Sequence, residues 1–185
     1  MFLKAFLFFF IFFNFSLNLH ANEKRSIINK LLKINNFTFN FEQITPGKTE
    51  TGKCFLVFDN KLKCKYIGEK QKEIIINKKT LVVMHKKYDK IYFYPISNSP
   101  FAKLLSKKSL VRLVRESKLE LKDNITLVYL DKNKKKITVF FKKDNHELIG
   151  WQIKDEFQNK IAFLLQIQSV NTQIEDDLFK IPSIN

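Results

Sequence analysis

The 185-residue sequence is short of the residues on which many enzyme sites depend. It has four Gly, four Pro, two Cys and three His. So little Gly and Pro excludes a collagen-like chain or a flexible linker and favours a compact domain. Neither His85 nor His146 lies in H-E-x-x-H spacing or beside a cluster of Cys, His and carboxylates, and no G-x-S-x-G, P-loop or dinucleotide glycine pattern occurs. The sequence therefore predicts no catalytic site, no metal site and no cofactor.

No apolar run reaches the roughly 20 residues that span a bilayer as a helix. The run Ala5–Phe13 follows one cation, Lys4, and the small residue Ala21 precedes a charged segment. This order is typical of a secretory signal peptide. We expect residues 1–21 to direct export and to be cleaved, leaving residues 22–185 as a single domain. The cleavage region holds no Cys, so a lipid-modified mature N-terminus is not expected.

Acidic residues are also scarce. The chain has 33 Lys and Arg against 18 Asp and Glu, a formal net charge of +15. The cations are spread along almost every segment, which indicates solvated surface lysines. Attraction to an anionic membrane surface or to an acidic partner is the functional alternative. No Arg-rich helix, zinc spacing or ribonucleoprotein motif occurs, so no nucleic-acid partner is expected.

The sequence does contain one helical segment followed by many short strands. Residues 26–34 place apolar side chains on one helical face, with Ser26 as the N-cap. Beyond them, short apolar or alternating runs are separated by polar turns such as Asp59-Asn60. The expected strands are 37–43, 53–58, 61–67, 73–76, 81–85, 91–94, 125–130, 137–141, 147–154 and 161–170. Links of turn length predict an antiparallel meander rather than βαβ units.

The meander is interrupted after residue 94. Pro95 and Pro100 bracket a polar segment, and Phe101, Leu104 and Leu105 then share a helical face. We expect two short helical pieces here, which cover the open side of a curved sheet.

The two cysteines are equidistant from Asp59. If the flanking strands pair through a loop centred on that residue, Cys54 lies opposite Cys64, and a cross-strand disulfide is possible in an oxidising compartment. The alternatives are two buried free thiols, or a register shifted by one residue that turns Cys54 away.

In this order the motifs resemble the LolA family of periplasmic outer-membrane lipoprotein carriers. The resemblance covers nearly the whole mature chain and rests on the N-terminal helix, Phe41-Glu42-Gln43 ahead of Gly52, the stretch Leu62 to Tyr66, the segment Tyr94 to Leu105, Leu148 to Asp155, Gln158 to Ile161, Asn171 and Phe179 to Pro182. It implies a mainly β fold with minor α: a strongly curved antiparallel sheet, or incomplete β-barrel, covered by an N-terminal helix and short central helices.

One position departs from the family. The family often has an Arg-Pro pair before the turn that follows the strand starting at Gly52, and that arginine is tied to its lid. Here Phe58 and Asp59 take those positions, so no arginine switch is carried over. Arg112 and Arg115 are the substitutes that the sequence offers.

The resemblance implies a monomeric periplasmic carrier that makes and breaks no bond. It would accept acylated lipoproteins from an inner-membrane ABC-type exporter, hold their acyl chains in an apolar cavity, and pass them to an outer-membrane receptor. The candidate cavity residues are Leu56, Phe58, Leu62, Tyr66, Val83, Ile91, Phe93, Phe140 and Phe163, and the candidate lid residues are Phe101, Leu104 and Leu105. Ordinary core packing is the alternative for each, because alternation indicates burial and cannot reveal an empty cavity.

Two other classes stay open. One is a general envelope protein that binds free lipid or anionic polymers, and the other is a periplasmic hydrolase with a site that no motif reveals.

Overall fold

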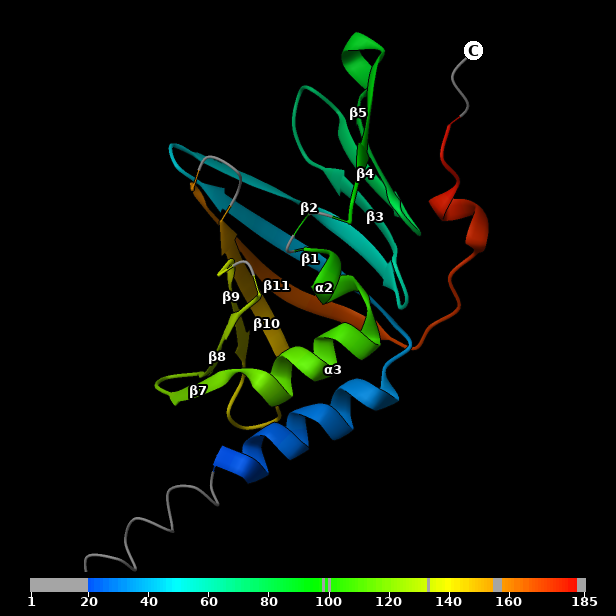
Figure 1. Ribbon diagram of the computed structural model, residues 1–185. Coiled ribbons are helices and arrows are strands. Elements are labelled where there is room, and N and C mark those ends of the chain that lie inside the picture. Colours follow the sequence, from blue (N-terminus) through cyan, green and yellow to red (C-terminus); the bar gives the residue numbers. More distant parts are fainter. Residues whose placement is uncertain (1–19, 98, 100, 133, 155–157, 183–185) are drawn as a thin grey trace, which may run out of the picture.

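The computed structural model describes residues 20–97, 99, 101–132, 134–154 and 158–182. These residues form one curved antiparallel sheet of eleven strands, with helices across its concave side (Figure 1). The predicted class, mainly β with minor α in an unclosed curved sheet, is confirmed. Of the predicted leader, residues 1–19 lie outside the described residues.

The strands are β1 (Asn36–Thr45), β2 (Lys48–Val57), β3 (Lys61–Tyr66), β4 (Lys72–Asn77), β5 (Thr80–His85), β6 (Lys90–Pro95), β7 (Lys118–Leu121), β8 (Ile125–Leu130), β9 (Lys136–Phe141), β10 (Leu148–Lys154) and β11 (Lys160–Val170). Their order in the sheet is β6-β5-β4-β3-β2-β1-β11-β10-β9-β8-β7. Two meanders are therefore joined by the pairing of β1 with β11, and β6 and β7 form the two open edges. Strand β7 was not predicted from the sequence.

Strand β3 has the alternation that the sequence predicts. Leu62, Cys64 and Tyr66 are buried on the concave side, while the three lysines between and before them point the other way. The register of β2 and β3 places Cys54 opposite Cys64, and a disulfide joins the two side chains. The polar turn at Asp59-Asn60 sets this register, because the two strands pair symmetrically around it.

The helical elements are a helix over residues 20–33, α2 (Ala102–Leu105), α3 (Lys107–Glu116), η1 (Lys86–Tyr88) and η2 (Asp176–Phe179). Residues 20–25 are already helical, so Ser26 lies inside the helix and its prediction as N-cap is wrong. In α3 the cap is Ser106, whose Oγ accepts a hydrogen bond from Ser109 N over 3.4 Å.

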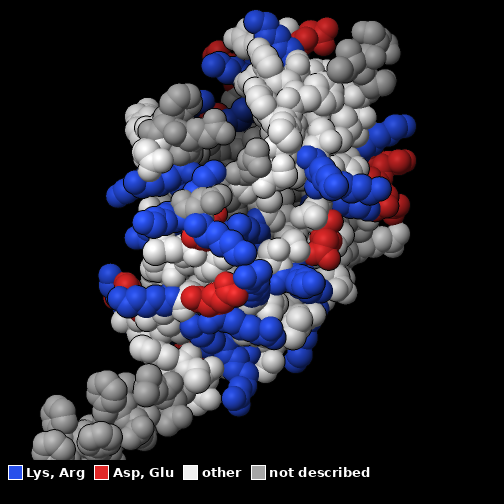
Figure 2. Space-filling model, viewed as in Figure 1, with Lys and Arg blue, Asp and Glu red and all other residues white. Residues whose placement is uncertain are grey.

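The helix over residues 20–33 and α3 run side by side in opposite directions (Figure 1). At one end, Lys24 Nζ donates to Arg115 O over 3.0 Å; at the other, Lys107 Nζ donates to Leu32 O over 3.4 Å. Their outer surfaces carry many Lys and Arg side chains (Figure 2). The two helices therefore form one continuous cover over the sheet.

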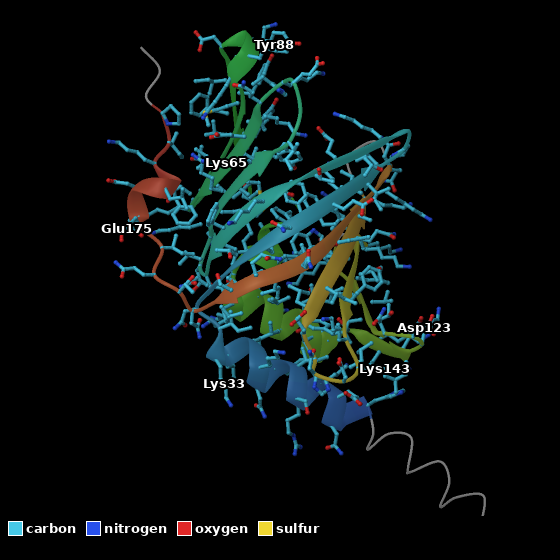
Figure 3. The ribbon with its side chains drawn as sticks, turned by 180° about the vertical axis from the view of Figure 1, so that it is seen from behind. Lys33, Lys65, Tyr88, Asp123, Lys143 and Glu175 are labelled. Atoms are coloured by element: carbon cyan, nitrogen blue, oxygen red, sulfur yellow. A yellow bond between two sulfur atoms is a disulfide. The ribbon has the colours of Figure 1, made fainter. Side chains whose placement is uncertain are left out.

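The main core lies between the concave face and this helical cover, and a second, small cluster lies on the outer face. Ile75, Val82 and Met84 form the small cluster, against which Ile181 packs. The C-terminal segment runs along this outer side past β3 and β4 (Figure 3), where Phe179 is fully buried and its carbonyl accepts from Asn77 Nδ2 over 3.2 Å. The C-terminal segment thus covers part of the outer face of β3 and β4.

Candidate functional site

An apolar cavity of about 190 Å³ lies on the concave face. It is lined from both halves of the sheet and from the residue that precedes α2. The lining residues are Phe39, Gln43, Cys54, Leu62, Cys64, Tyr66, Ile74, Ile76, Leu81, Phe101, Trp151, Ile153, Ile161 and Phe163. Almost all of this wall is hydrocarbon, aromatic ring or disulfide, so it suits an apolar ligand.

A second hollow lies under α2 and α3, and side chains almost fill it, leaving about 10 Å³. Phe101 and Trp151 line both spaces and therefore separate them. The ring centroids of Phe101 and Trp151 are 5.5 Å apart, and Trp151 stacks on Phe163 at 5.4 Å. Phe101 belongs to this aromatic stack and immediately precedes α2. The position of α2 therefore determines whether the two spaces stay separate.

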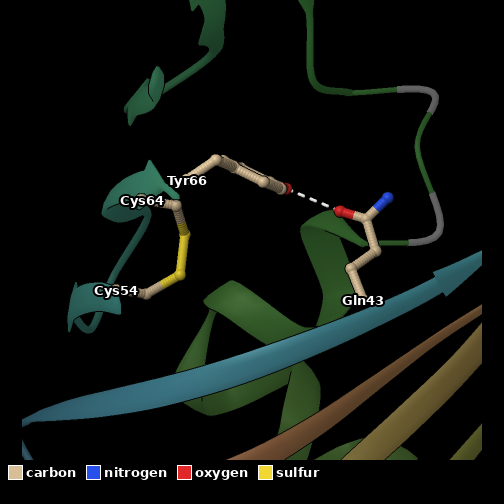
Figure 4. The surroundings of a disulfide bond; sticks show 4 residues. All are labelled: Gln43, Cys54, Cys64 and Tyr66. Atoms are coloured by element: carbon tan, nitrogen blue, oxygen red, sulfur yellow. Dashed lines mark hydrogen bonds between the residues drawn. A yellow bond between two sulfur atoms is a disulfide. The ribbon is translucent and has the colours of Figure 1, made fainter. Parts of the chain in front are cut away.

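Three polar groups interrupt the apolar wall. The Tyr66 hydroxyl donates to Gln43 Oε1 over 2.6 Å, next to the disulfide (Figure 4). Burial raises the pKa of Tyr66 well above its usual range, so the hydroxyl keeps its proton and remains a donor. The third group, Trp151 Nε1, is buried and has no hydrogen-bond partner among the described residues. A buried N–H left unpaired costs about 1–3 kcal/mol.

The turn between β2 and β3 holds the junction between α2 and α3. Asp59 Oδ1 accepts from Lys107 N over 2.7 Å, and Asn60 N donates to Leu105 O over 3.1 Å. Lys107 Nζ also donates to Asn35 Oδ1 over 2.9 Å. These contacts fix the cover of the cavity at the turn where Phe58 and Asp59 take the positions of the family's Arg-Pro pair.

Neither arginine considered as a substitute reaches this turn. The Arg112 side chain is 64% exposed and pairs with Glu116 at 2.8 Å along the outer side of α3. Arg115 is exposed as well. The suggestion that either one holds the lid in place of the missing arginine is therefore wrong, because both point into solvent.

Most of the candidate residues lie on the concave side. Leu62, Tyr66 and Phe163 line the apolar cavity. Leu56 and Phe58, together with the lid candidates Phe101, Leu104 and Leu105, line the filled hollow under α2 and α3. Val83 is opposite Ile74 in the register and so shares the concave face, although it does not line the cavity.

Ile91 and Phe93 lie on the outer face, which corrects their assignment to the cavity. They are opposite Met84 and Val82 in the register of β5 and β6, and both partners belong to the outer cluster. Neighbouring strands keep paired residues on one face, so Tyr92 and Tyr94, opposite Val83 and Leu81, lie on the concave side of β6.

Phe140 also lies on the outer face. Its neighbours Val139 and Phe141 are fully buried in the main core, and Val139 is opposite Trp151. Phe140 shares its face of β9 with Lys136 and Thr138, whereas Ile137, Val139 and Phe141 form the apolar face, so the alternation already indicated the outer side for Phe140. The prediction that Phe140 lines the cavity is therefore wrong.

Several lining residues were not predicted: Phe39, Gln43, Ile74, Ile76, Leu81, Trp151, Ile153 and Ile161. A signal for some of them exists in the sequence. The cysteine pairing indicates the face of β3 that carries Leu62 and Cys64. Their partners across the next hairpin, Ile76 and Ile74, lie on the same face. For Trp151 and Ile161 no local signal exists, because their position facing the cavity depends on the pairing of β10 with β11.

The outer face carries ion pairs. Glu73 Oε1 is 2.6 Å from Lys86 Nζ and its Oε2 is 3.1 Å from Lys63 Nζ. Although burial opposes ionisation, these two lysines hold the pKa of Glu73 below its usual range. A larger open hollow of about 610 Å³ lies on this side and is lined partly by Lys53 and Lys65. Its mixed polar wall, open to solvent, contrasts with the apolar cavity.

Within the described part of the chain, no group of three or more His, Cys, Asp or Glu side chains could hold a metal ion. None of the described helices has the length and hydropathy needed to cross a membrane.

Comparison with known proteins identifies a family that this chain matches. The sequence model described as outer membrane lipoprotein carrier protein LolA matches residues 32–182. The outer-membrane lipoprotein carrier protein of Campylobacter jejuni is 28% identical over 183 residues, which are 96% of this chain and 92% of that protein. Both matches include the strands that line the cavity.

Solved structures give the same fold at low identity. An uncharacterised conserved protein from Thermus thermophilus superposes with a TM-score of 0.52 at 10% identity, covering 88% of this chain and 94% of that chain. The structure of MucB gives 0.51 at 12% identity, covering 88% of this chain and 64% of that chain. These similarities are evidence for the fold alone.

Proposed function

The chain belongs to the LolA family of outer membrane lipoprotein carrier proteins, and from this premise we propose that it holds the acyl chains of lipoproteins in the concave-face cavity. The observation that carries the proposal is the apolar wall between the sheet and its helical cover. An exposed sixteen-carbon chain costs about 12 kcal/mol in water, at about 0.8 kcal/mol per CH₂. A carrier that crosses an aqueous gap therefore needs an enclosed apolar site.

The cavity must enlarge to take such a chain. Its volume of about 190 Å³ is below the roughly 300–1,000 Å³ of ordinary ligand pockets. Moving Phe101 away from Trp151, together with α2, joins the cavity to the hollow beneath Leu104 and Leu105. These three residues, Phe101, Leu104 and Leu105, are thus the lid in this proposal.

The acyl chain enters a space whose wall has few polar groups. Tyr66 and Gln43 form a hydrogen bond with each other, and the rest of the wall is apolar. Binding in this form makes and breaks no covalent bond.

The family suggests the wider route, and the physics of transfer agrees with it. Transfer from a bilayer to a protein cavity exchanges one apolar medium for another, so extraction needs an energised partner and release needs a better site. We place the protein in the periplasm as a monomer, residues 22–185 after loss of the leader, between an inner-membrane ABC-type exporter and an outer-membrane receptor.

The test is lipoprotein release from inner-membrane vesicles that contain the exporter and ATP. The protein should move lipoproteins into the soluble fraction, and Ile161→Asp should lower this release at least about tenfold, because it places a charge in the apolar wall. Leu164→Asp is the matched control on the same strand: Leu164 is 44% exposed, so this variant should release normally.

Release no greater than in vesicles without the protein would contradict the carrier role. Uptake of free phospholipid in the absence of lipoprotein release would support a general envelope lipid-binding protein instead.

A further inference from the structure

The two covering helices present adjoining rows of cations to solvent. On the helix over residues 20–33, Arg25 and Lys33 are exposed, opposite the buried Ile27 and Leu31. On α3 the exposed row is Lys108, Arg112, Arg115 and Glu116. In α3 the cations are three or four residues apart, and Arg25 and Lys33 are eight residues apart, about two turns, so the cations of each helix lie on one side of it.

Hydrogen bonds between the helices bring these rows together. Lys24 Nζ joins the first helix to Arg115 O, so Arg25 lies near the Arg115 end. Lys107 Nζ joins α3 to Leu32 O, so Lys33 lies near the Lys108 end. Figure 2 shows Lys and Arg side chains gathered over both helices with few acidic ones among them. We name this surface, comprising Arg25, Lys33, Lys108, Arg112 and Arg115, the basic helical face.

Little of the charge on the basic helical face is compensated. Glu116 pairs with Arg112, and among the described residues the other four cations form no ion pair. On the outer face of the sheet, by contrast, the carboxylate of Glu73 lies between Lys63 and Lys86, at 3.1 and 2.6 Å. The basic helical face therefore offers four cations without an ion-pair partner among the described residues, along two adjoining helices.

An apolar side chain is exposed within the same surface. Leu32 is 53% exposed although it neighbours the buried Leu31, and it precedes Lys33. Exposed leucine among cations on a helix that lies flat is typical of surfaces that bind the headgroup region of a bilayer.

We propose that the basic helical face is a docking surface for anionic lipid bilayers. Its cations are spread along two helices about 15–20 Å long and surround no pocket, which suits a continuous negative surface. Each Lys or Arg near such a surface strengthens binding about fivefold at low salt. The other side of α3 carries Leu110, which lines the hollow under the lid, so docking brings the cover of the cavity against the membrane.

The proposal is tested by co-sedimentation of the purified protein with vesicles of phosphatidylcholine, with and without phosphatidylglycerol. We expect binding only to vesicles with phosphatidylglycerol, and loss of that binding at high salt. Combining Arg25→Gln, Lys33→Gln, Lys108→Gln and Arg115→Gln should weaken binding at least about tenfold. All four side chains are exposed, so the fold is retained, which thermal unfolding checks.

The matched control removes the same charge elsewhere: Lys53→Gln, Lys65→Gln, Lys70→Gln and Lys79→Gln. These exposed lysines lie on the outer side of the sheet and in its turns, where Lys65 is far from Lys33 (Figure 3). Their combined loss should weaken binding less than about threefold.

Equal losses of vesicle binding in the two variants would overturn the proposal, because the total charge of the protein, and not the basic helical face, would then determine binding. Failure of the unaltered protein to bind phosphatidylglycerol vesicles would also overturn it, and binding to polyglutamate alone would identify an acidic protein as the partner. The vesicles hold no lipoprotein and no exporter, so the outcome does not depend on the carrier role.

Discussion

Glu73 shows how a single residue can tie three elements together. Only 6% of it is exposed, on the outer face of β4, and its carboxylate contacts Lys63 of β3 and Lys86 of η1. A buried carboxylate is favourable only when partners compensate for its lost hydration. The two lysines do so, and they also hold its pKa below the usual value.

Glu73→Gln should lower the free energy of unfolding by about 1–3 kcal/mol at neutral pH. Because the folded-state pKa is lowered, the contribution of Glu73 is full above its unfolded pKa of about 4.3 and is lost as the pH falls through the folded value. Urea unfolding of both proteins from neutral to acid pH measures this difference.

The two stability curves should therefore converge in acid. The control is Glu69→Gln, whose carboxylate is 92% exposed and 3.8 Å from Lys87, and which should change little at any pH. A difference for Glu73→Gln that persists unchanged below its folded pKa would contradict this role.

The orientation of single residues was predictable only where one face of a strand is polar. In β3, lysines alternate with Leu62, Cys64 and Tyr66, so the sequence assigns both faces correctly. In β6, Ile91 and Phe93 alternate with Tyr92 and Tyr94, and both sets are hydrophobic. Only the pairing with β5 decides between them, which is why the cavity assignment of Ile91 and Phe93 failed.

Among the elements, α2 depends most on its surroundings. It has four residues, too few for a stable helix in isolation, so its position is set by tertiary contacts. The turn at Asp59 and Asn60 supplies hydrogen bonds to the α2–α3 junction. The sequence predicted the helical pieces from Pro95, Pro100 and their apolar spacing, but a contact between residues 59 and 107 has no local signal.

Asp59→Ala should loosen the cover of the cavity. Loss of the bond from Lys107 N costs about 1 kcal/mol, so amide hydrogen exchange in residues 102–110 should speed up about fivefold. Exchange in β8 and β9 should not change. Asp123→Ala, in the exposed turn between β7 and β8, is the control and should leave α2 unaffected. Equal protection of the α2 amides from exchange in the unaltered protein, Asp59→Ala and Asp123→Ala would show that Asp59 does not hold α2.

At the scale of the whole molecule, local turns account for most of the sheet and one long-range pairing completes it. The hairpin turns predicted nearly all neighbouring strands, whereas the joining of β1 to β11 pairs residues such as Phe37 and Val170. That pairing brings Trp151 beside Phe39 and Phe163 beside Phe41, and so it creates the cavity wall. Composition and alternation could indicate burial there, but not the unfilled space.

The molecule thus separates two surfaces: an apolar space inside the curve of the sheet and a charged exterior that includes the basic helical face. The carrier proposal depends on the first and the docking proposal on the second. Variants at Ile161 and at the four helical cations should therefore affect cargo uptake and vesicle binding independently, as distant sites usually do.

The most direct test of acyl-chain binding on the concave face is photo-crosslinking at two adjacent residues of β11. A benzophenone side chain in place of Phe163, which lines the cavity, should crosslink to lipoproteins released from inner-membrane vesicles. The same group in place of Leu164, which is 44% exposed and on the opposite face, should not. Crosslinking from Leu164 equal to or stronger than that from Phe163 would contradict a cargo site inside the curve of the sheet.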